Sequence, residues 1–212
     1  MRGDVVIVTV SIVLLIIAIV AATAVGRTID SEFKRPWLSA AICILLVSCL
    51  ALQLSMPELL SFVQRDASVM QWGQAYRLFT ALWFQDGEVS GGAFNIAMLA
   101  VLGAIAEQVL RKVTWLSIYL IGGLTSEVVA LDWQPVGAGN SLAYMSLAGA
   151  LLGLAFGRPS YRGVRLVAGF GLVAGGLLCI RKDIHGAAII IGFALLMLAR
   201  IGFPGGEIRK TS

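Results

Sequence analysis

Two side chains that could act together in nucleophilic catalysis stand near the starts of two apolar segments of this sequence. Ser141 ends the run Gly137-Ala138-Gly139-Asn140-Ser141, and His185 is the only histidine in the chain. A serine hydroxyl becomes a useful nucleophile when a base within hydrogen-bond reach takes its proton, and histidine is the usual base. Free backbone N–H groups at a helix start could also stabilise a developing oxyanion. The sequence therefore suggests Ser141 and His185 as a catalytic pair.

The composition indicates that most of the surface of this chain is solvated by lipid. Of its 212 residues, 58% are hydrophobic and only 13% are charged, and the mean hydropathy is +0.90. Soluble domains have about 25% charged residues, and a water-soluble core of this size could not hide so much apolar surface. The three cysteines, Cys43, Cys49 and Cys179, have neither disulfide-framework nor zinc-ligand spacing, and no metal or cofactor is expected.

Seven apolar segments predict an all-α membrane protein, because a helix needs about 20 apolar residues to cross a bilayer. They cover residues 5–26, 36–57, 89–106, 113–131, 133–157, 166–180 and 184–199. Ala22-Thr23-Ala24 also resembles a signal-peptidase site, so the first segment could be a cleaved signal peptide. We expect it to stay as a helix, since its uncharged run is long enough to span.

The positive charges predict the orientation of these helices. With seven spans, the larger share of the 16 Lys and Arg residues falls on one side, which the positive-inside rule makes cytoplasmic. The N-terminus is then outside, the C-terminus is inside, and Ser141 and His185 both lie near the outer ends of their helices. The net charge of +4 is accordingly a topology signal, with no nucleic-acid partner implied. The expected location is the plasma membrane of a bacterium.

Small residues recur along the two segments that carry Ser141 and His185. Gly149 lies two helical turns beyond Ser141, and Gly192 lies seven residues beyond His185. Stripes of small residues let two membrane helices approach closely. We therefore expect these two helices to be in contact, with the hydroxyl and the imidazole brought together at their outer ends.

These residues resemble the rhomboid family of intramembrane serine proteases, over about residues 37–200. Gly139-Asn140-Ser141 is similar to the family's G-x-S nucleophile motif, with Gly149 at its next glycine, and His185 to Gly192 is similar to the pattern of its last helix. Further similarities lie in Tyr76-Arg77, in Asn95 of an H-x-x-x-N element and in Gly103-x-x-x-Glu107.

The resemblance implies a six-helix transmembrane bundle over residues 36–201, with an extra N-terminal helix and cytoplasmic linker over 1–35 and a cytoplasmic tail over 202–212. It implies an endopeptidase in which Ser141 and His185 are catalytic, while the N–H of Ser141 and the amide of Asn95 hold the oxyanion. Gly139, Gly149, Gly192, Arg77 and Glu107 would be structural. The implied partners are the lipid bilayer and single-span membrane proteins, which would enter past residues 166–180.

Several departures from the family pattern support a second hypothesis, a pseudoprotease that binds transmembrane clients without cleaving them. Gly91 stands where the family has the histidine of H-x-x-x-N, and Leu142 replaces the glycine after the nucleophile. A small transporter or channel is a third hypothesis, which the lack of internal repeats weakens.

Three features near the candidate site have their own interpretations. Glu127, an acid within an apolar segment, is either a hydrogen-bonded structural group or a proton-relay carboxylate. Asp183 lies two residues before His185, so a helix would point it away and no triad is expected. Residues 58–88 mix aromatic with charged side chains, which suits an amphipathic lobe in the membrane interface.

Overall fold

The computed structural model describes residues 2–26, 35–71, 73–157 and 162–202. Most of the predicted cytoplasmic linker and nearly all of the predicted tail therefore lie outside the described residues. Within the described ranges the chain is almost entirely helical and contains no β-strand. This confirms the all-α prediction.

In the described part of the chain, seven helical runs cross the molecule, and a lobe of short helices joins two of them. The long elements are α1 (Arg2–Gly26), α2 (Trp37–Ser55), α5 (Glu88–Val109), α8 (Ser141–Phe156), α9 (Arg162–Ile180) and α10 (Ile184–Gly202). One further run consists of α6 (Lys112–Ser117), the π-helical turn η2 (Ile118–Gly122) and α7 (Gly123–Trp133). The lobe, residues 56–87, contains α3 (Leu59–Val63), the 3₁₀ helix η1 (Ala67–Met70) and α4 (Tyr76–Thr80).

Five of the helical runs are long and apolar enough to span a membrane, which is the composition of a multi-pass membrane protein. They are Trp37–Ser55, Glu88–Val109, Lys112–Trp133, Arg162–Ile180 and Ile184–Ile201. The other two contain shorter apolar helices, Val10–Ala21 and Ser141–Phe156. The expected segment over residues 133–157 was too long, because α7 ends at Trp133 and α8 begins at Ser141. Pro135, Gly137 and Gly139 fall in the interval and disfavour helix.

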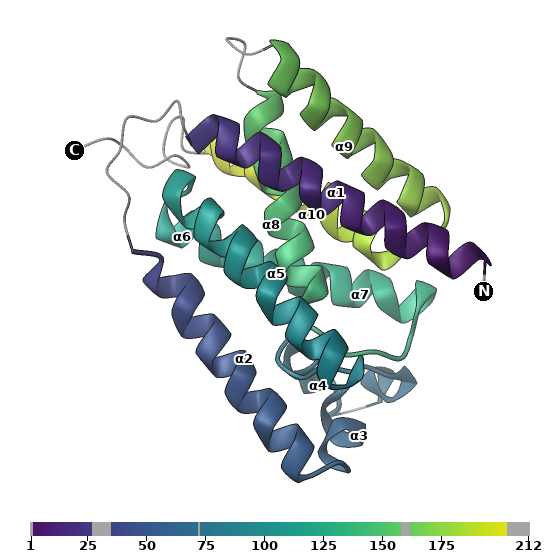
Figure 1. The fold of residues 1–212 in the computed structure, drawn as a ribbon. Helices are drawn as coiled ribbons and strands as arrows, with labels where there is room; N and C mark the ends of the chain where they lie inside the picture. The colour runs from purple at the N-terminus through teal and green to yellow at the C-terminus, as the bar shows by residue number, and fades with distance from the viewer. Residues whose placement is uncertain (1, 27–34, 72, 158–161, 203–212) are drawn as a thin grey trace.

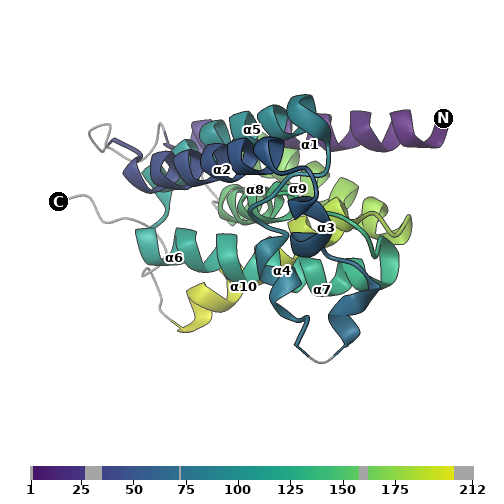
Figure 2. The same ribbon diagram turned by 90° about the horizontal axis from the view of Figure 1, so that it is seen from below.

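Helix α8 forms the centre of the bundle, and α1, α5, α7, α9 and α10 pack around it. Figure 2 shows it in the middle, with the other helices on all sides. Every side chain of α8 from Leu142 to Ala155 is buried. The outer helices expose large apolar side chains instead, among them Phe170, Ile180 and Leu198. Lipid is the solvent that suits this outer surface, because exposing apolar side chains to lipid costs no free energy of hydration.

The closest helix packing joins α8 to α10 and depends on two glycines. A Cβ at Gly149 would overlap the backbone carbonyl of Ile189, and a Cβ at Gly192 would overlap the backbone carbonyl of Ser146. Each helix thus presses a glycine against the other helix's main chain. The predicted contact between these two helices is confirmed, and it holds the first residues of α8 and α10 at the same end of the bundle (Figure 1).

The N-terminal helix α1 is packed into the same bundle. It contacts α5, α8 and α9, and its side chains Leu14, Leu15 and Ala18 are at most 2% exposed. On the facing helix, Gly171 leaves room for Ile17, whose side chain would lie 3.1 Å from a Cβ at that position. The helix that was expected to precede the core therefore covers part of it.

Glu107, near the end of α5, caps the start of α2. Its carboxylate oxygens accept hydrogen bonds from the backbone N–H of Leu38 at 3.2 Å and from the N–H and hydroxyl of Ser39, both at 3.0 Å. A carboxylate suits this position because the first N–H groups of a helix lack intrahelical acceptors. Gly103, one turn earlier, leaves room for Ser39 Oγ, which would lie 3.0 Å from a Cβ there. This pair of residues joins α2 to α5.

Arg77 holds the lobe together from inside. Its guanidinium donates to the carbonyls of Ser61 at 2.8 Å and Gln64 at 3.1 Å, to Gln74 at 2.9 Å and to the carboxylate of Asp66 at 3.2 Å. The lobe also exposes large apolar side chains, Phe62, Met70 and Phe79. Their exposure fits the predicted interfacial position, which stays a prediction.

The glycine contact between α8 and α10 can be tested with alanine, the smallest substitution that adds a Cβ. We expect Gly149→Ala to lower the melting temperature in detergent, because overpacking a close contact costs about 1–3 kcal/mol. Gly176→Ala in α9 is the matched control, because nothing lies within 4 Å of a Cβ there. That control should be neutral or stabilising, since alanine favours a helix over glycine by about 1 kcal/mol. Equal melting temperatures for the two variants would contradict the packing.

Candidate active site

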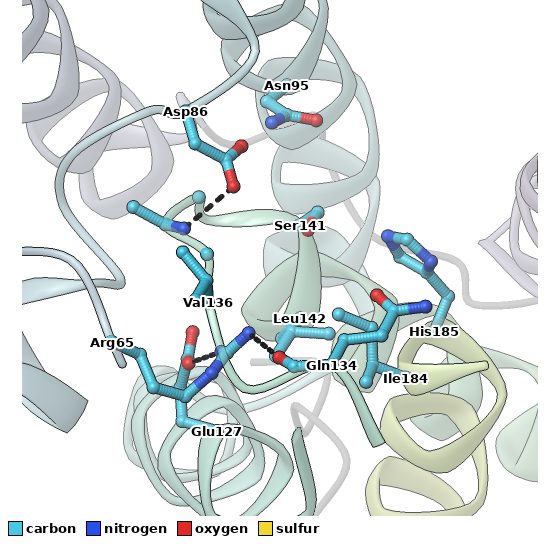
Figure 3. A pocket seen from close by; sticks show the side chains of 13 residues that line it. Arg65, Asp86, Asn95, Glu127, Gln134, Val136, Ser141, Leu142, Ile184 and His185 are labelled. Carbon is cyan, nitrogen blue, oxygen red and sulfur yellow. Dashed lines mark hydrogen bonds and ion pairs between the residues drawn. The ribbon is translucent and has the colours of Figure 1, made fainter. Parts of the chain in front are cut away.

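A cavity of about 250 Å³ lies where the lobe, α5, α7, α8 and α10 meet. Ser141 and His185 both line it, together with Asn95. Figure 3 shows the imidazole ring of His185 beside Ser141, with a ring nitrogen on the side nearer the serine. The structure therefore brings together the three side chains to which chemistry was assigned. The other lining residues are Arg65, Asp86, Glu127, Gln134, Val136, Gly137, Ala138, Gly139, Leu142 and Ile184.

Ser141 is the first residue of α8, and the loop before it is held in place by hydrogen bonds to the lobe. Gly139 N–H donates to the carbonyl of Ala81 at 2.8 Å, and Ala138 N–H donates to the carboxylate of Asp86 at 3.0 Å. Gly139 has a φ of +155°, a conformation that residues with a side chain rarely adopt. The glycine two positions before the serine is therefore required by the backbone.

Ser141 is in the first turn of α8, among the backbone N–H groups that begin the helix. The first four N–H groups of any helix have no intrahelical acceptor, and together with the helix dipole they favour negative charge. No hydrogen bond links Ser141 Oγ to His185 within the described part of the chain. Catalytic hydrogen bonds are often long before substrate binds. The absence of a hydrogen bond between Ser141 and His185 is therefore compatible with both a reactive and an unreactive pair.

His185 lies at the second position of α10 and is held by Asp183. The carboxylate oxygen Oδ1 of Asp183 accepts from the backbone N–H of His185 at 2.9 Å and lies 3.1 Å from Nδ1 of the ring. The expectation that Asp183 would point away was wrong. It assumed that the helix includes Asp183, whereas α10 begins at Ile184 and Asp183 caps it from outside.

The pKa of the Asp183 carboxyl group is lowered although the group is buried. Burial alone would raise its pKa, but hydrogen bonds from His185 and the backbone N–H of Gly186, with the attraction of His185, lower the pKa below its usual value. Only 2% of Asp183 is exposed. A buried carboxylate with these donors is held in one orientation.

Asn95 is oriented by a chain of buried amides. Its side-chain NH₂ donates to Gln85 Oε1 at 2.9 Å, and its Oδ1 accepts from the hydroxyl of Tyr144 at 3.1 Å. Gln85 in turn donates to Asn140 Oδ1 at 3.0 Å, and its backbone N–H and carbonyl bond to the side-chain amide of Gln53. An amide nitrogen carries two hydrogens, so Asn95 keeps one N–H for another acceptor.

A buried ion pair forms part of the cavity wall. Arg65 Nη1 contacts Glu127, and the two side chains are 2% and 1% exposed. Arg65 also donates to the carbonyl of Gln134 at 2.8 Å, and its main chain pairs with Gly137 through two hydrogen bonds. Glu127 is thus hydrogen-bonded, as the first of its two predicted interpretations requires. Figure 3 shows both contacts of Arg65.

The remaining predicted residues stand away from the cavity. Arg77 lies within the lobe, Glu107 lies at the opposite end of α5, and Gly149 and Gly192 lie along the contact between α8 and α10. Gly91 is one turn before Asn95, and nothing lies within 4 Å of a Cβ built there. No group of three or more His, Cys, Asp or Glu side chains in the described ranges could hold a metal ion.

The sequence did not identify Gln53, Gln85, Arg65 or Tyr144 as neighbours of the candidate pair. One signal was available for Gln53, the only amide between apolar residues of α2, because buried polar groups in membrane segments need partners. Arg65 had no such signal, since its partner Glu127 is 62 residues away. We found no protein-family model that matches this chain and no curated protein that is similar to it.

The buried ion pair predicts coupled effects of substitution. Arg65→Met and Glu127→Met should each lower the free energy of unfolding in detergent by about 3–5 kcal/mol, because each leaves one charge buried without a partner. The double variant should lose much less than the sum of the two. Arg165→Met, at the exposed start of α9, is the control and should change it by less than about 0.5 kcal/mol. Additive losses in the double variant would show that the two charges do not interact.

Proposed function

We propose that this protein is an intramembrane serine endopeptidase of the rhomboid type. The observation that carries the proposal is the shared cavity at the starts of α8 and α10, which Ser141 and His185 both line. One helix, α9, separates these two helices in the sequence, and their glycine contact gives the pair a defined geometry. The number of helical runs from α2 to α10, six in the described residues, supports the six-helix bundle that the rhomboid resemblance implies.

In the proposed reaction, Ser141 Oγ attacks the carbonyl carbon of a peptide bond while its proton passes to His185 Nε2. The tetrahedral intermediate collapses as the C–N bond breaks, and His185 returns the proton to the leaving amine. Water then hydrolyses the acyl-enzyme with the same histidine as base. Nε2 is the ring nitrogen available to the serine, because Nδ1 lies 3.1 Å from Asp183.

The oxyanion would be held by two donors from different helices. The backbone N–H of Ser141 belongs to the free first turn of α8, and the second hydrogen of the Asn95 amide is not used by Gln85. Gly91 offers no third donor. Losing one such donor typically slows an acyl-transfer enzyme by about 10²–10³-fold, so the expected enzyme is slow.

The expected substrates are single-span membrane proteins, cleaved near the outer face of the bilayer. The cavity lies at the lobe end of the bundle, where α7 ends and where α8 and α10 begin. The charge distribution predicts that this end is outside, in the plasma membrane of a bacterium. The lipid-facing helix α9 is the proposed side of entry.

The alternative is a client-binding protein that keeps the fold without the reaction. The observations in its favour are Leu142, 2% exposed, in the cavity wall directly after the candidate nucleophile, and Gly91, which supplies no side-chain donor one turn before Asn95. Such a protein would bind transmembrane helices but leave their peptide bonds intact.

The proposed topology predicts opposite accessibility for the two ends of the run from α6 to α7. Lys112→Cys and Asp132→Cys, in a chain whose Cys43, Cys49 and Cys179 are replaced by alanine, should react with an impermeant maleimide from opposite faces. Both positions are exposed and lie at the two ends of one 22-residue run. In intact cells Asp132→Cys should react and Lys112→Cys should not. Reaction of both would exclude the orientation and the outer active site.

The catalytic assignment predicts that a serine-directed fluorophosphonate probe modifies Ser141 in the purified full-length protein. Ser141→Ala should abolish labelling because it removes the nucleophile, and His185→Ala should reduce it by at least about 10²-fold because it removes the base. Ser146→Ala is a control, since the Ser146 hydroxyl is buried and bonded to the carbonyl of Leu142. Labelling that survives Ser141→Ala would refute the assignment.

Gly91→His separates the slow enzyme from the client-binding alternative. In an assay with a panel of reconstituted single-span substrates, this variant should cleave at least as fast as wild type, because the open space at Gly91 can hold a donor one turn before Asn95. Failure of wild type and variant to cleave, with no probe on Ser141, would favour client binding.

A further inference from the structure

The turn between α9 and α10 places Asp183 in one defined position. The backbone N–H of Asp183 donates to the carbonyl of Leu178 at 3.0 Å, and the preceding Lys182 N–H donates to Cys179 at 2.9 Å. Lys182 has a φ of +55°, a left-handed conformation that reverses the chain within a few residues. The carboxylate of Asp183 is therefore delivered to the start of α10 by a short, hydrogen-bonded turn.

From this position one carboxylate oxygen serves two donors of the same residue. Asp183 Oδ1 accepts from the backbone N–H of His185 at 2.9 Å and lies 3.1 Å from its Nδ1. The backbone contact is that of an ordinary helix cap. The ring contact is additional, and a cap alone does not require it. It determines which nitrogen of the imidazole carries the proton, because a carboxylate oxygen can only accept.

We propose that Asp183 is a positioning residue of the candidate active site, which orients the imidazole of His185 and keeps the proton of its neutral form on Nδ1. This inference rests on the proposed function, and it converts the expected pair into a serine–histidine–aspartate arrangement. When His185 Nε2 takes the proton of Ser141, the ring becomes cationic, and the adjacent carboxylate stabilises that charge. Asp183 itself stays ionised, and Nδ1 keeps its proton throughout.

Other groups near His185 do not offer this contact. Of the titratable side chains that line the cavity, Arg65 and Glu127 are committed to each other, and the carboxylate of Asp86 accepts from Ala138 N–H. Cys179, at the end of α9, is a weak hydrogen-bond partner. Among the described residues, Asp183 is the one whose side chain lies within hydrogen-bond distance of the ring of His185.

Three substitutions at Asp183 separate capping from positioning. Serine caps a helix well but is too short to bring an oxygen to the ring, asparagine keeps both the cap and an acceptor oxygen without charge, and alanine provides neither. If Asp183 only caps α10, the serine and asparagine variants should label with the fluorophosphonate probe as fast as wild type. If it positions His185, the serine variant should melt within a few degrees of wild type yet label roughly 10²-fold more slowly. The asparagine variant should fall between them.

A second measurement reports on the histidine without requiring any reaction. Because His185 is the only histidine, protein labelled with ¹⁵N-histidine gives NMR signals from one imidazole. We expect its neutral form to carry the proton on Nδ1 in wild type and to become a mixture of tautomers in Asp183→Ser. A mixture in wild type, or the same tautomer in both proteins, would overturn the inference.

The two measurements also distinguish failure of the inference from failure of the proposed function. Absence of probe labelling in wild type would count against the peptidase, while the tautomer comparison would still decide whether Asp183 orients the ring. Normal labelling with an unchanged tautomer in Asp183→Ser would leave the peptidase in place and reject the role of Asp183.

Discussion

The contact between α8 and α10 is the constraint on which the candidate site depends. At Gly149 and Gly192 each helix meets the other's main chain, so the spacing of the two helices is set by backbone atoms. Backbone atoms cannot move to another rotamer, and the spacing is therefore less adjustable than one set by side chains. Ser141 and His185 lie at the first and second positions of these helices, and their separation follows from this contact.

A short helix can occupy the centre of the bundle because the lobe satisfies the polar groups of the loop that precedes it. Helix α8 has only 16 residues, and an irregular loop precedes it. Irregular backbone at membrane depth is tolerated only when protein or trapped water satisfies its polar groups. Here the lobe supplies the partners, since Arg65 pairs with Gly137 and Ala81 accepts from Gly139. The lobe is thus part of the site's support, and Arg77 in turn holds the lobe together.

Local spacing was enough to predict the pairing of α8 with α10, because glycines at helical intervals mark the face of a close contact. The lengths of the apolar segments were enough to predict the five long apolar helices. The boundary between α7 and α8 could not be predicted from charge, because the uncharged run over residues 133–157 continues through the turn that separates the two helices. The orientation of Asp183 was predicted wrongly because the start of α10 was placed one residue too early. Helix boundaries are the least reliable feature of any sequence-based assignment. Within a helix it would point away, but as a cap its side chain turns back on His185.

Long-range polar contacts were beyond the sequence for a different reason. Gln85 meets Asn140 across 55 residues, and Arg65 meets Glu127 across 62, with no periodicity to relate them. Their effect on Asn95 bears on what the cavity does. Through Gln85 and Tyr144, the amide of Asn95 is oriented by the protein alone. Binding a client helix does not require a donor fixed in this way, whereas stabilising an oxyanion does, because preorganised donors need no reorientation as charge develops. The buried amide chain is therefore an argument for catalysis that is independent of Ser141 and His185.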